Sequence, residues 1–186
     1  MADPGHGGHH ASARVAYMPA RLAAAVLAVL VATPAQGARL TRASKITFAG
    51  VGAVHFNMTV AQARRASGRW IDVGPEVTRD CRHDRVLPRR LGLATLTFER
   101  RIRVLYVSER GLATRRGIRV GDRLSRLRAR YGDALHERGS DVSPGTRIFE
   151  FRRGNREIHF DVFDGNRVRV ISTGARPEID FSEGCA

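Results

Sequence analysis

The sequence has few aromatic residues, a single lysine and only two cysteines. Aromatic residues make up 6% of the chain, so a broad aromatic recognition face is not expected. The cysteines do not complete a zinc site, which needs three or four ligands at organised spacing. Serine-nucleophile elbows, zinc-protease helices and phosphate-binding glycine loops are also missing. These absences argue against the recognisable enzyme classes, and no cofactor or metal is expected.

An apolar run near the N-terminus follows Arg21 and stops before Pro34. It is shorter than the roughly 20 apolar residues that a transmembrane helix needs, and it is typical of a signal peptide. Ala35 and Gly37 supply the small residues that cleavage requires. The sequence therefore predicts a signal peptide over residues 1–37.

The predicted mature chain, residues 38–186, retains both cysteines, Cys81 and Cys185. In an oxidising exterior, two lone cysteines most economically pair, so we expect one disulfide. Closing so long a loop would stabilise the fold by about 4–5 kcal/mol in the chain-entropy model.

Met18 is an alternative start of the signal peptide, because a compact n-region begins there. The sequence thus predicts a secreted protein with no membrane span after processing.

The basic residues give the chain a formal charge of +14, and nearly all of them are arginine. Two interpretations stay open: the composition of a GC-rich genome, and an arginine-lined surface for polyanions. For an exported protein, such polyanions are envelope polymers, anionic lipid head groups or acidic proteins, whereas the compartment argues against nucleic acid. The candidate polyanion-binding residues lie on two predicted helices: Arg64, Arg65, Arg126, Arg128 and Arg130.

Two similar halves follow one another in the mature chain, at about residues 46–107 and 112–173, before a C-terminal tail. Each predicts a short strand, a capped amphipathic helix and then further strands. In the first half, Thr59 and Gln62 have the spacing of a capping box. In the second, Asp122 is the expected N-cap.

Strand patterns follow each predicted helix, and Gly68 and Gly132 are the expected helix terminators. The expected strands cover residues 77–86, 93–98, 102–107, 146–151, 157–163 and 167–172, and residues 99–101 are the expected turn between the second strand and the third. Gly-Asn and Asp-Gly pairs separate the last three and favour hairpin turns, because these residues accept positive φ. The predicted fold class is α+β, with two tandem repeats, each a short helix packed on an antiparallel β-meander.

Short motifs across the mature domain resemble those of a family of secreted proteins of high-GC Gram-positive bacteria. More distantly they resemble the β-lactamase-inhibitor-protein-like fold, which is built from two helix-plus-sheet repeats. The motifs are residues 54–59, Thr114, residues 117–122, Tyr131-Gly132 and residues 183–185. Asn57 stands where that family usually has glycine. The resemblance implies an exported, non-catalytic, protein-binding domain, but not β-lactamase inhibition, because one fold hosts many functions.

Single residues give weaker indications of function. The histidines of the mature chain are candidate bases without a recognisable nucleophile: His55, His83, His136 and His159. His159 alternates with the apolar residues of its strand, which predicts a surface or rim position. Trp70 and Tyr106 are candidate partner-binding residues, because large amphipathic side chains anchor interfaces. A half-buried core position is the alternative for both.

The sequence therefore predicts an exported, disulfide-linked, basic and non-catalytic binding module. It would present a sheet face to a protein or to an anionic envelope polymer. A secreted enzyme with a site that is not recognisable from sequence is the alternative, and a structural envelope component is a third hypothesis. A histidine within hydrogen-bond reach of serine or aspartate in a polar cleft would favour the enzyme. An arginine rim beside exposed aromatic residues would favour binding.

Overall fold

The structure is a computed structural model, and it describes residues 39–180 except 79, 141–144 and 164. The described residues all belong to a single compact unit of the chain. The predicted signal peptide and Cys185 therefore lie outside the described residues. Within these residues, no helix is both long enough and apolar enough to cross a membrane.

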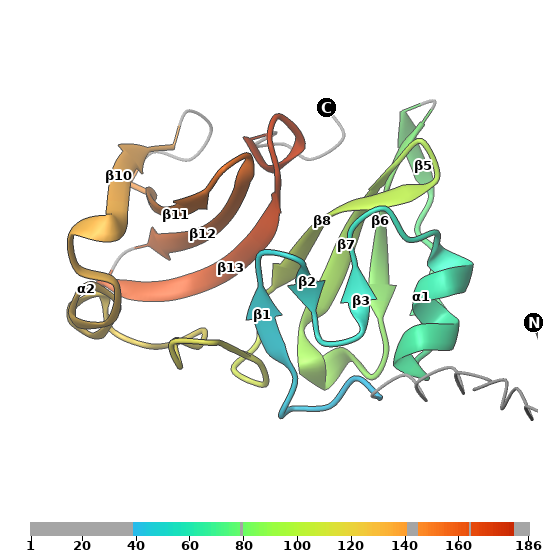
Figure 1. The fold of residues 1–186 in the computed structure, drawn as a ribbon, viewed down its shortest axis with the longest axis horizontal. Coiled ribbons are helices and arrows are strands. Elements are labelled where there is room, and N and C mark those ends of the chain that lie inside the picture. The colour runs from blue at the N-terminus through green and yellow to red at the C-terminus, as the bar shows by residue number, and fades with distance from the viewer. Residues whose placement is uncertain (1–38, 79, 141–144, 164, 181–186) are drawn as a thin grey trace, which may run out of the picture. The chain divides into compact units, whose positions relative to one another are not determined.

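A nine-stranded antiparallel sheet forms the main layer (Figure 1). Strands β8 and β13 pair with each other, which joins the strands that follow helix α1 to those that follow helix α2. The order across the sheet is β10 (Leu135–Gly139), β11 (Arg147–Arg153), β12 (Arg156–Phe163), β13 (Arg167–Ala175), β8 (Arg101–Val107), β7 (Leu93–Phe98), β6 (Cys81–Val86) and β4 (Ile71–Asp72), and β5 (Glu76–Thr78) also pairs with β6. The predicted α+β class is confirmed.

Two hairpin turns of this sheet occur where the sequence predicted them. Between β11 and β12, Gly154 takes a φ of 61°, the left-handed region that favours glycine. Between β7 and β8, Glu99 and Arg100 take φ values of 48° and 61° without any glycine. Strand β10 was not predicted, because its polar sequence lacks the alternation of apolar residues.

A small second sheet packs against the large one and is built from β1 (Lys45–Thr47), β2 (Gly50–Val51), β3 (Val54–His55) and β9 (Ala113–Thr114). At Gly50, whose φ is 142°, a Cβ atom would lie 2.1 Å from the carbonyl oxygen of Val54. Only glycine allows this close approach. After β3, Asn57 has a φ of 65°, so asparagine here adopts the left-handed conformation that glycine favours.

Helix α1 (Val60–Ser67) has the predicted capping box, in which the Thr59 hydroxyl accepts from the Gln62 amide and the Gln62 side chain accepts from the Thr59 amide. Helix α2 (Leu124–Tyr131) is also present, but its predicted N-cap is wrong. Arg123 occupies that position and makes no side-chain capping bond. The carboxylate of Asp122 instead accepts a hydrogen bond from the backbone amide of Arg119, at 3.0 Å.

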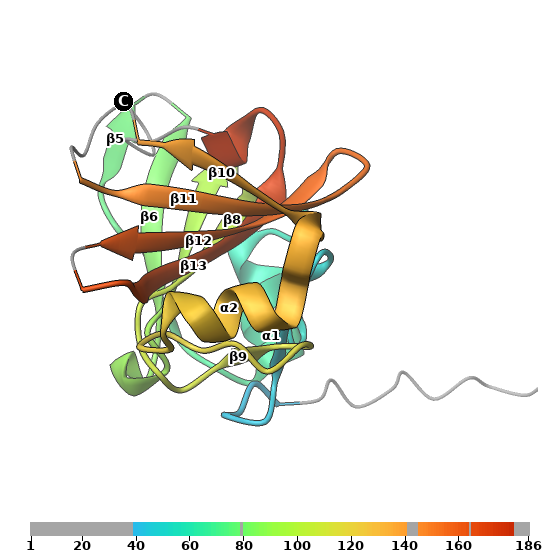
Figure 2. The same ribbon diagram turned by 90° about the vertical axis from the view of Figure 1, so that its left-hand side faces the viewer.

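The main apolar core lies on one face of the large sheet. Val60 and Ala63 from α1, and Leu127 and Tyr131 from α2, share a single buried cluster with the inner residues of both sheets. Figure 2 shows α2 beside β13, and the Tyr131 ring meets the Phe160 ring with a centroid distance of 5.1 Å. The opposite face of the sheet has a smaller apolar cluster and a network of charged side chains.

Candidate anion-binding cleft

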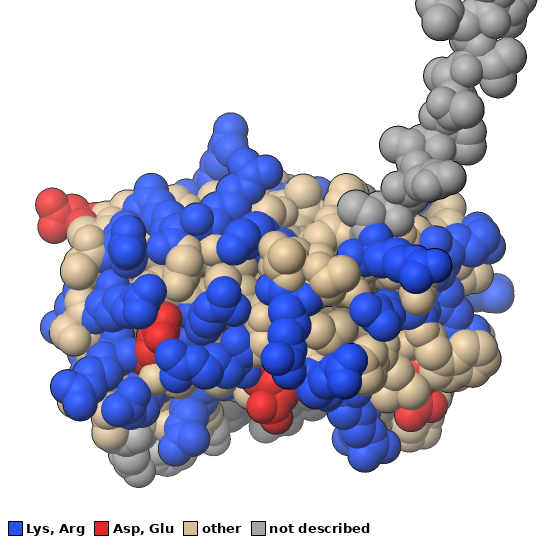
Figure 3. Space-filling view, turned by 90° about the horizontal axis from the view of Figure 1, so that it is seen from below, with Lys and Arg blue, Asp and Glu red and all other residues tan. Residues whose placement is uncertain are grey.

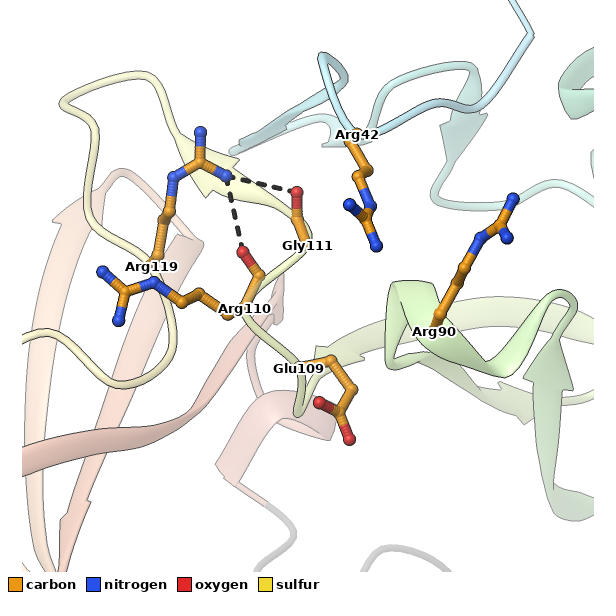
Figure 4. A pocket seen from close by; sticks show the side chains of 6 residues that line it. All are labelled: Arg42, Arg90, Glu109, Arg110, Gly111 and Arg119. Carbon is orange, nitrogen blue, oxygen red and sulfur yellow. Dashed lines mark hydrogen bonds between the residues drawn. The ribbon is translucent and has the colours of Figure 1, made fainter.

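An arginine-lined cleft of about 550 Å³ lies where four segments of the chain meet (Figure 4). Arg42 precedes β1, Arg90 belongs to the short helix η1 (Arg89–Leu91), and Arg110 follows β8. The remaining lining residues are Glu109, Gly111 and Arg119. The lining thus contains four arginines and a single acidic residue, which gives the cleft a positive potential.

Local backbone geometry brings these segments together. Pro88 precedes η1, and Gly92 ends it with a φ of 60°. The Ser108 amide donates to the Gly92 carbonyl at 2.8 Å, and a Cβ atom at position 92 would lie 2.4 Å from the Glu109 nitrogen. Glycine at this position therefore permits the contact that places η1, and with it Arg90, beside the 109–111 segment.

The four arginines of the cleft differ in how they are held. Arg119 Nη1 donates to the carbonyl of Gly111 at 3.2 Å, which ties the loop that follows β9 to the cleft floor. Arg110 Nη2 lies 3.7 Å from an oxygen of Asp122. Within the described residues, Arg42 and Arg90 have no acidic side chain within salt-bridge distance, and both are exposed. Arg42 and Arg90 are therefore the guanidinium groups available to a ligand.

A second hollow of about 430 Å³ adjoins the first and shares Arg42 and Arg90 with it. It adds Arg69, whose Nε donates to the Leu40 carbonyl at 2.9 Å. Figure 3 views this side of the molecule and shows Lys and Arg side chains spread across it, with few Asp and Glu side chains between them. We call the two adjoining hollows the arginine cleft, defined by Arg42, Arg69, Arg90, Arg110 and Arg119.

The candidate arginines on the helices do not line this cleft. On α1, Arg64 stacks over the Trp70 ring at 4.2 Å and Arg65 is exposed. On α2, Arg126 lies 3.6 Å from Asp122, Arg128 lies 3.2 Å from Glu137, and Arg130 is exposed. Sequence reasoning missed the cleft because its arginines come from separate turns, and their only signal in the sequence was the general abundance of arginine.

The two candidate aromatic anchors lie apart in the sheet. Trp70, just before β4, has 62% of its surface exposed. Tyr106, on β8, is only partly exposed, and burial together with the nearby Asp161 carboxylate raises its pKa to about 12. Strands β6 and β7 separate β4 from β8 in the sheet order, so the two side chains do not form one recognition surface.

His159 corrects one prediction, because it is only 2% exposed instead of lying at a rim. Its Nε2 atom lies 2.7 Å from the carboxylate of Glu157, on the sheet face opposite the helices. Glu150 on β11 lies directly opposite His159 in the pairing of β11 with β12. Its carboxylate accepts hydrogen bonds from Arg138 and Arg152. Burial favours the neutral form of Glu150, but these arginines outweigh it and hold its pKa below the ordinary value.

The same side chains are the candidate metal ligands of this face. Ligand atoms of Glu150, Glu157, His159 and Asp180 lie within 4.8 Å of one another. Arg176 Nε, however, lies 2.6 Å from Glu157 and 3.4 Å from Asp180, and Arg138 and Arg152 bind Glu150. Because guanidinium groups already neutralise the carboxylates, the arrangement fits a structural ion-pair network better than a cation site.

The chemistry of the arginine cleft is that of binding. Arginine stays protonated in proteins and offers only donors, so these side chains can hold an anion but cannot take up a proton from a substrate. Comparison of the chain with protein-family models, with curated proteins and with solved structures finds no match.

Proposed function

We propose that this protein is an exported, non-catalytic binding module that holds an anionic envelope polymer in the arginine cleft. The observation that carries the proposal is the pair Arg42 and Arg90, two exposed guanidinium groups shared by both hollows of the cleft. Guanidinium forks match phosphate and carboxylate groups in bidentate geometry. Two adjoining hollows favour a chain with repeated anionic groups over a single small anion.

The position of the cleft also refines the expected binding surface. The helices and the small sheet cover one face of the large sheet, and the charged network on the other face is already paired. The loop edge therefore supports ligand binding better than either sheet face. The proposal also includes export directed by residues 1–37 and a disulfide between Cys81 and Cys185, as expected for an extracellular domain.

We further propose that the two halves are structural repeats. Helix α1 is followed by β4, β6, β7 and β8, and helix α2 by β10, β11, β12 and β13. Each set runs from an outer edge of the sheet to its centre, where β8 meets β13. The segment that connects the two halves, between β8 and α2, supplies Arg110 and Arg119 to the arginine cleft, whereas Arg42, Arg69 and Arg90 come from the first half and the residues before it.

The test is binding to linear polyphosphate and to polygalacturonate, which present phosphate and carboxylate groups respectively. The variant Arg42→Gln/Arg90→Gln should weaken binding about tenfold at low salt, and the slope of log affinity against log salt should fall by about 1 for each lost contact. The matched control is Arg85→Gln/Arg169→Gln, which removes the same charge at exposed positions outside the cleft.

A third variant, Arg65→Gln/Arg130→Gln, tests the helical surface suggested by the sequence. Loss of affinity in this variant alone would move the site to the helices and refute the cleft. Equal loss in all three variants would mean that only net charge matters. Retention of full affinity by the cleft variant for both polymers would also refute the proposal, and capture of an acidic protein instead would identify a different class of partner.

A further inference from the structure

A second pocket, of about 320 Å³, lies between the small sheet and the β11–β12 hairpin. The apolar part of its lining consists mainly of Ile46, Phe48, Tyr131, Phe151 and Ile158. The pocket volume falls at the lower end of the range of small-molecule sites, about 300–1,000 Å³. It shares no lining residue with the arginine cleft. We call it the aromatic pocket.

Three rings build the wall of the aromatic pocket. The ring centroids of Phe48 and Phe151 are 5.1 Å apart, and those of Tyr131 and Phe151 are 4.9 Å apart with the planes at 71°. The Arg116 guanidinium lies 4.7 Å from the centroids of both Tyr131 and Phe151, and its Nη1 atom donates to the Arg130 carbonyl at 3.1 Å. The wall is therefore preorganised and does not depend on a ligand for its shape.

The rim of the pocket is positively charged. Arg115, Arg116 and Arg153 line it, and the lining contains no acidic residue. An adjoining hollow shares Phe48, Ala49 and Arg153 with the pocket and adds Arg156. The two hollows thus place four guanidinium groups around one aromatic wall.

Arg156 supplies the observation that points to a missing partner. Its guanidinium stacks on the Phe56 ring at 4.7 Å, yet its buried Nη1 atom has no hydrogen-bond partner among the described residues. A buried donor without an acceptor is costly, particularly on a charged group. Because that atom is shielded from solvent, an oxygen anion in this hollow would bind the other donors of Arg156 and those of Arg153, which make no side-chain hydrogen bond or ion pair among the described residues.

We propose that the aromatic pocket binds a small aromatic carboxylate, with the ring against Phe48 and Phe151 and the carboxylate held by Arg153 and Arg156. Offset or edge-to-face contacts with the wall favour a flat ring. The small volume disfavours a long acyl chain, and the arginine forks select a carboxylate over a neutral group. This site is independent of polymer binding in the arginine cleft.

The test uses cinnamate as the probe, with cinnamyl alcohol as its neutral analogue and octanoate as the aliphatic carboxylate. Binding is measured by calorimetry and by backbone amide chemical shifts of the full protein. We expect cinnamate to bind about tenfold more tightly than cinnamyl alcohol, because the alcohol loses the charge-assisted bonds. The largest shift changes should occur at Phe48, Ala49 and Arg153.

The variant Arg153→Gln/Arg156→Gln should weaken cinnamate binding about tenfold and leave the alcohol unaffected. The control variant Arg85→Gln/Arg169→Gln should bind cinnamate as the parent protein does. Equal affinity for cinnamate and the alcohol, or shift changes confined to other segments, would overturn the proposal. Tighter binding of octanoate than of cinnamate would overturn the aromatic assignment. The wild-type shift map decides the site even if the double variant does not fold.

Discussion

Replacing Asp161 with asparagine should make the protein more stable near neutral pH, and the gain should vanish in acid. Asp161 lies on β12, paired across the sheet with Ile148 on one side and Val170 on the other. Burial among such neighbours raises its pKa from 3.8 to about 6, although the positive charges of His159 and Arg138 work in the opposite direction. The folded protein therefore favours the protonated carboxyl.

The magnitude follows from the linkage between protonation and folding. One pKa unit corresponds to about 1.36 kcal/mol, so ionising Asp161 costs the folded state up to about 3 kcal/mol relative to the unfolded chain. The pKa of Asp161 is higher in the folded state than in the unfolded chain. The parent protein therefore has its full stability below about pH 4 and loses up to this amount as the pH rises to about 6. Asparagine resembles the neutral carboxyl in shape and has no charge to bury.

The assay is urea denaturation of both proteins from pH 4 to pH 8. The difference in free energy of unfolding should grow from pH 4 to about pH 6 and then level off, with the variant more stable. The exposed Asp133→Asn variant on η2 (Gly132–Ala134) is the control and should follow the parent protein at every pH. A difference that stays constant with pH, or a variant that is less stable at pH 8, would refute the reasoning.

Two further predictions concern the cap of α1 and the cysteines. Thr59→Ala should lower the free energy of unfolding by about 1 kcal/mol because the capping box is lost, whereas Thr59→Ser should retain most of it; an equal loss in both variants would contradict the role of the hydroxyl. Peptide mapping of the exported protein without reductant should recover one fragment that links Cys81 to Cys185, and recovery of two alkylated thiols would rule the disulfide out.

The features that the sequence predicted correctly depend on contacts between residues close in the chain. The Thr59 capping box spans one helical turn, and the Gly154-Asn155 turn needs only the conformational freedom of its own residues. Asp122 shows the limit of such reasoning. A competing local partner, the amide of Arg119, takes its carboxylate, and the helix begins one residue later than expected.

The features that the sequence did not predict depend on contacts between distant segments. His159 alternates with apolar residues, which is usual for an exposed side chain, yet Glu157 and the surrounding arginines bury it in an ion-pair network. The hairpin turns predict the pairing of β11, β12 and β13, but no local pattern reveals which charged side chains of these strands meet on the outer face of the sheet. The arginine cleft likewise exists only because Gly92 allows η1 to approach the segment after β8.

Pairing of the arginines bears on whether their abundance reflects genome composition or function. Arg138 and Arg152 bind the buried Glu150 carboxylate, so truncating them would leave an unpaired charge and destabilise the fold. Arg42 and Arg90 have no such role within the described residues, yet both line the two adjoining hollows of the arginine cleft. Composition bias alone gives no reason for unpaired arginines to gather at one hollow, because their mutual repulsion disfavours it. The anionic ligand that we propose would supply that reason, and the Arg42→Gln/Arg90→Gln variant tests it.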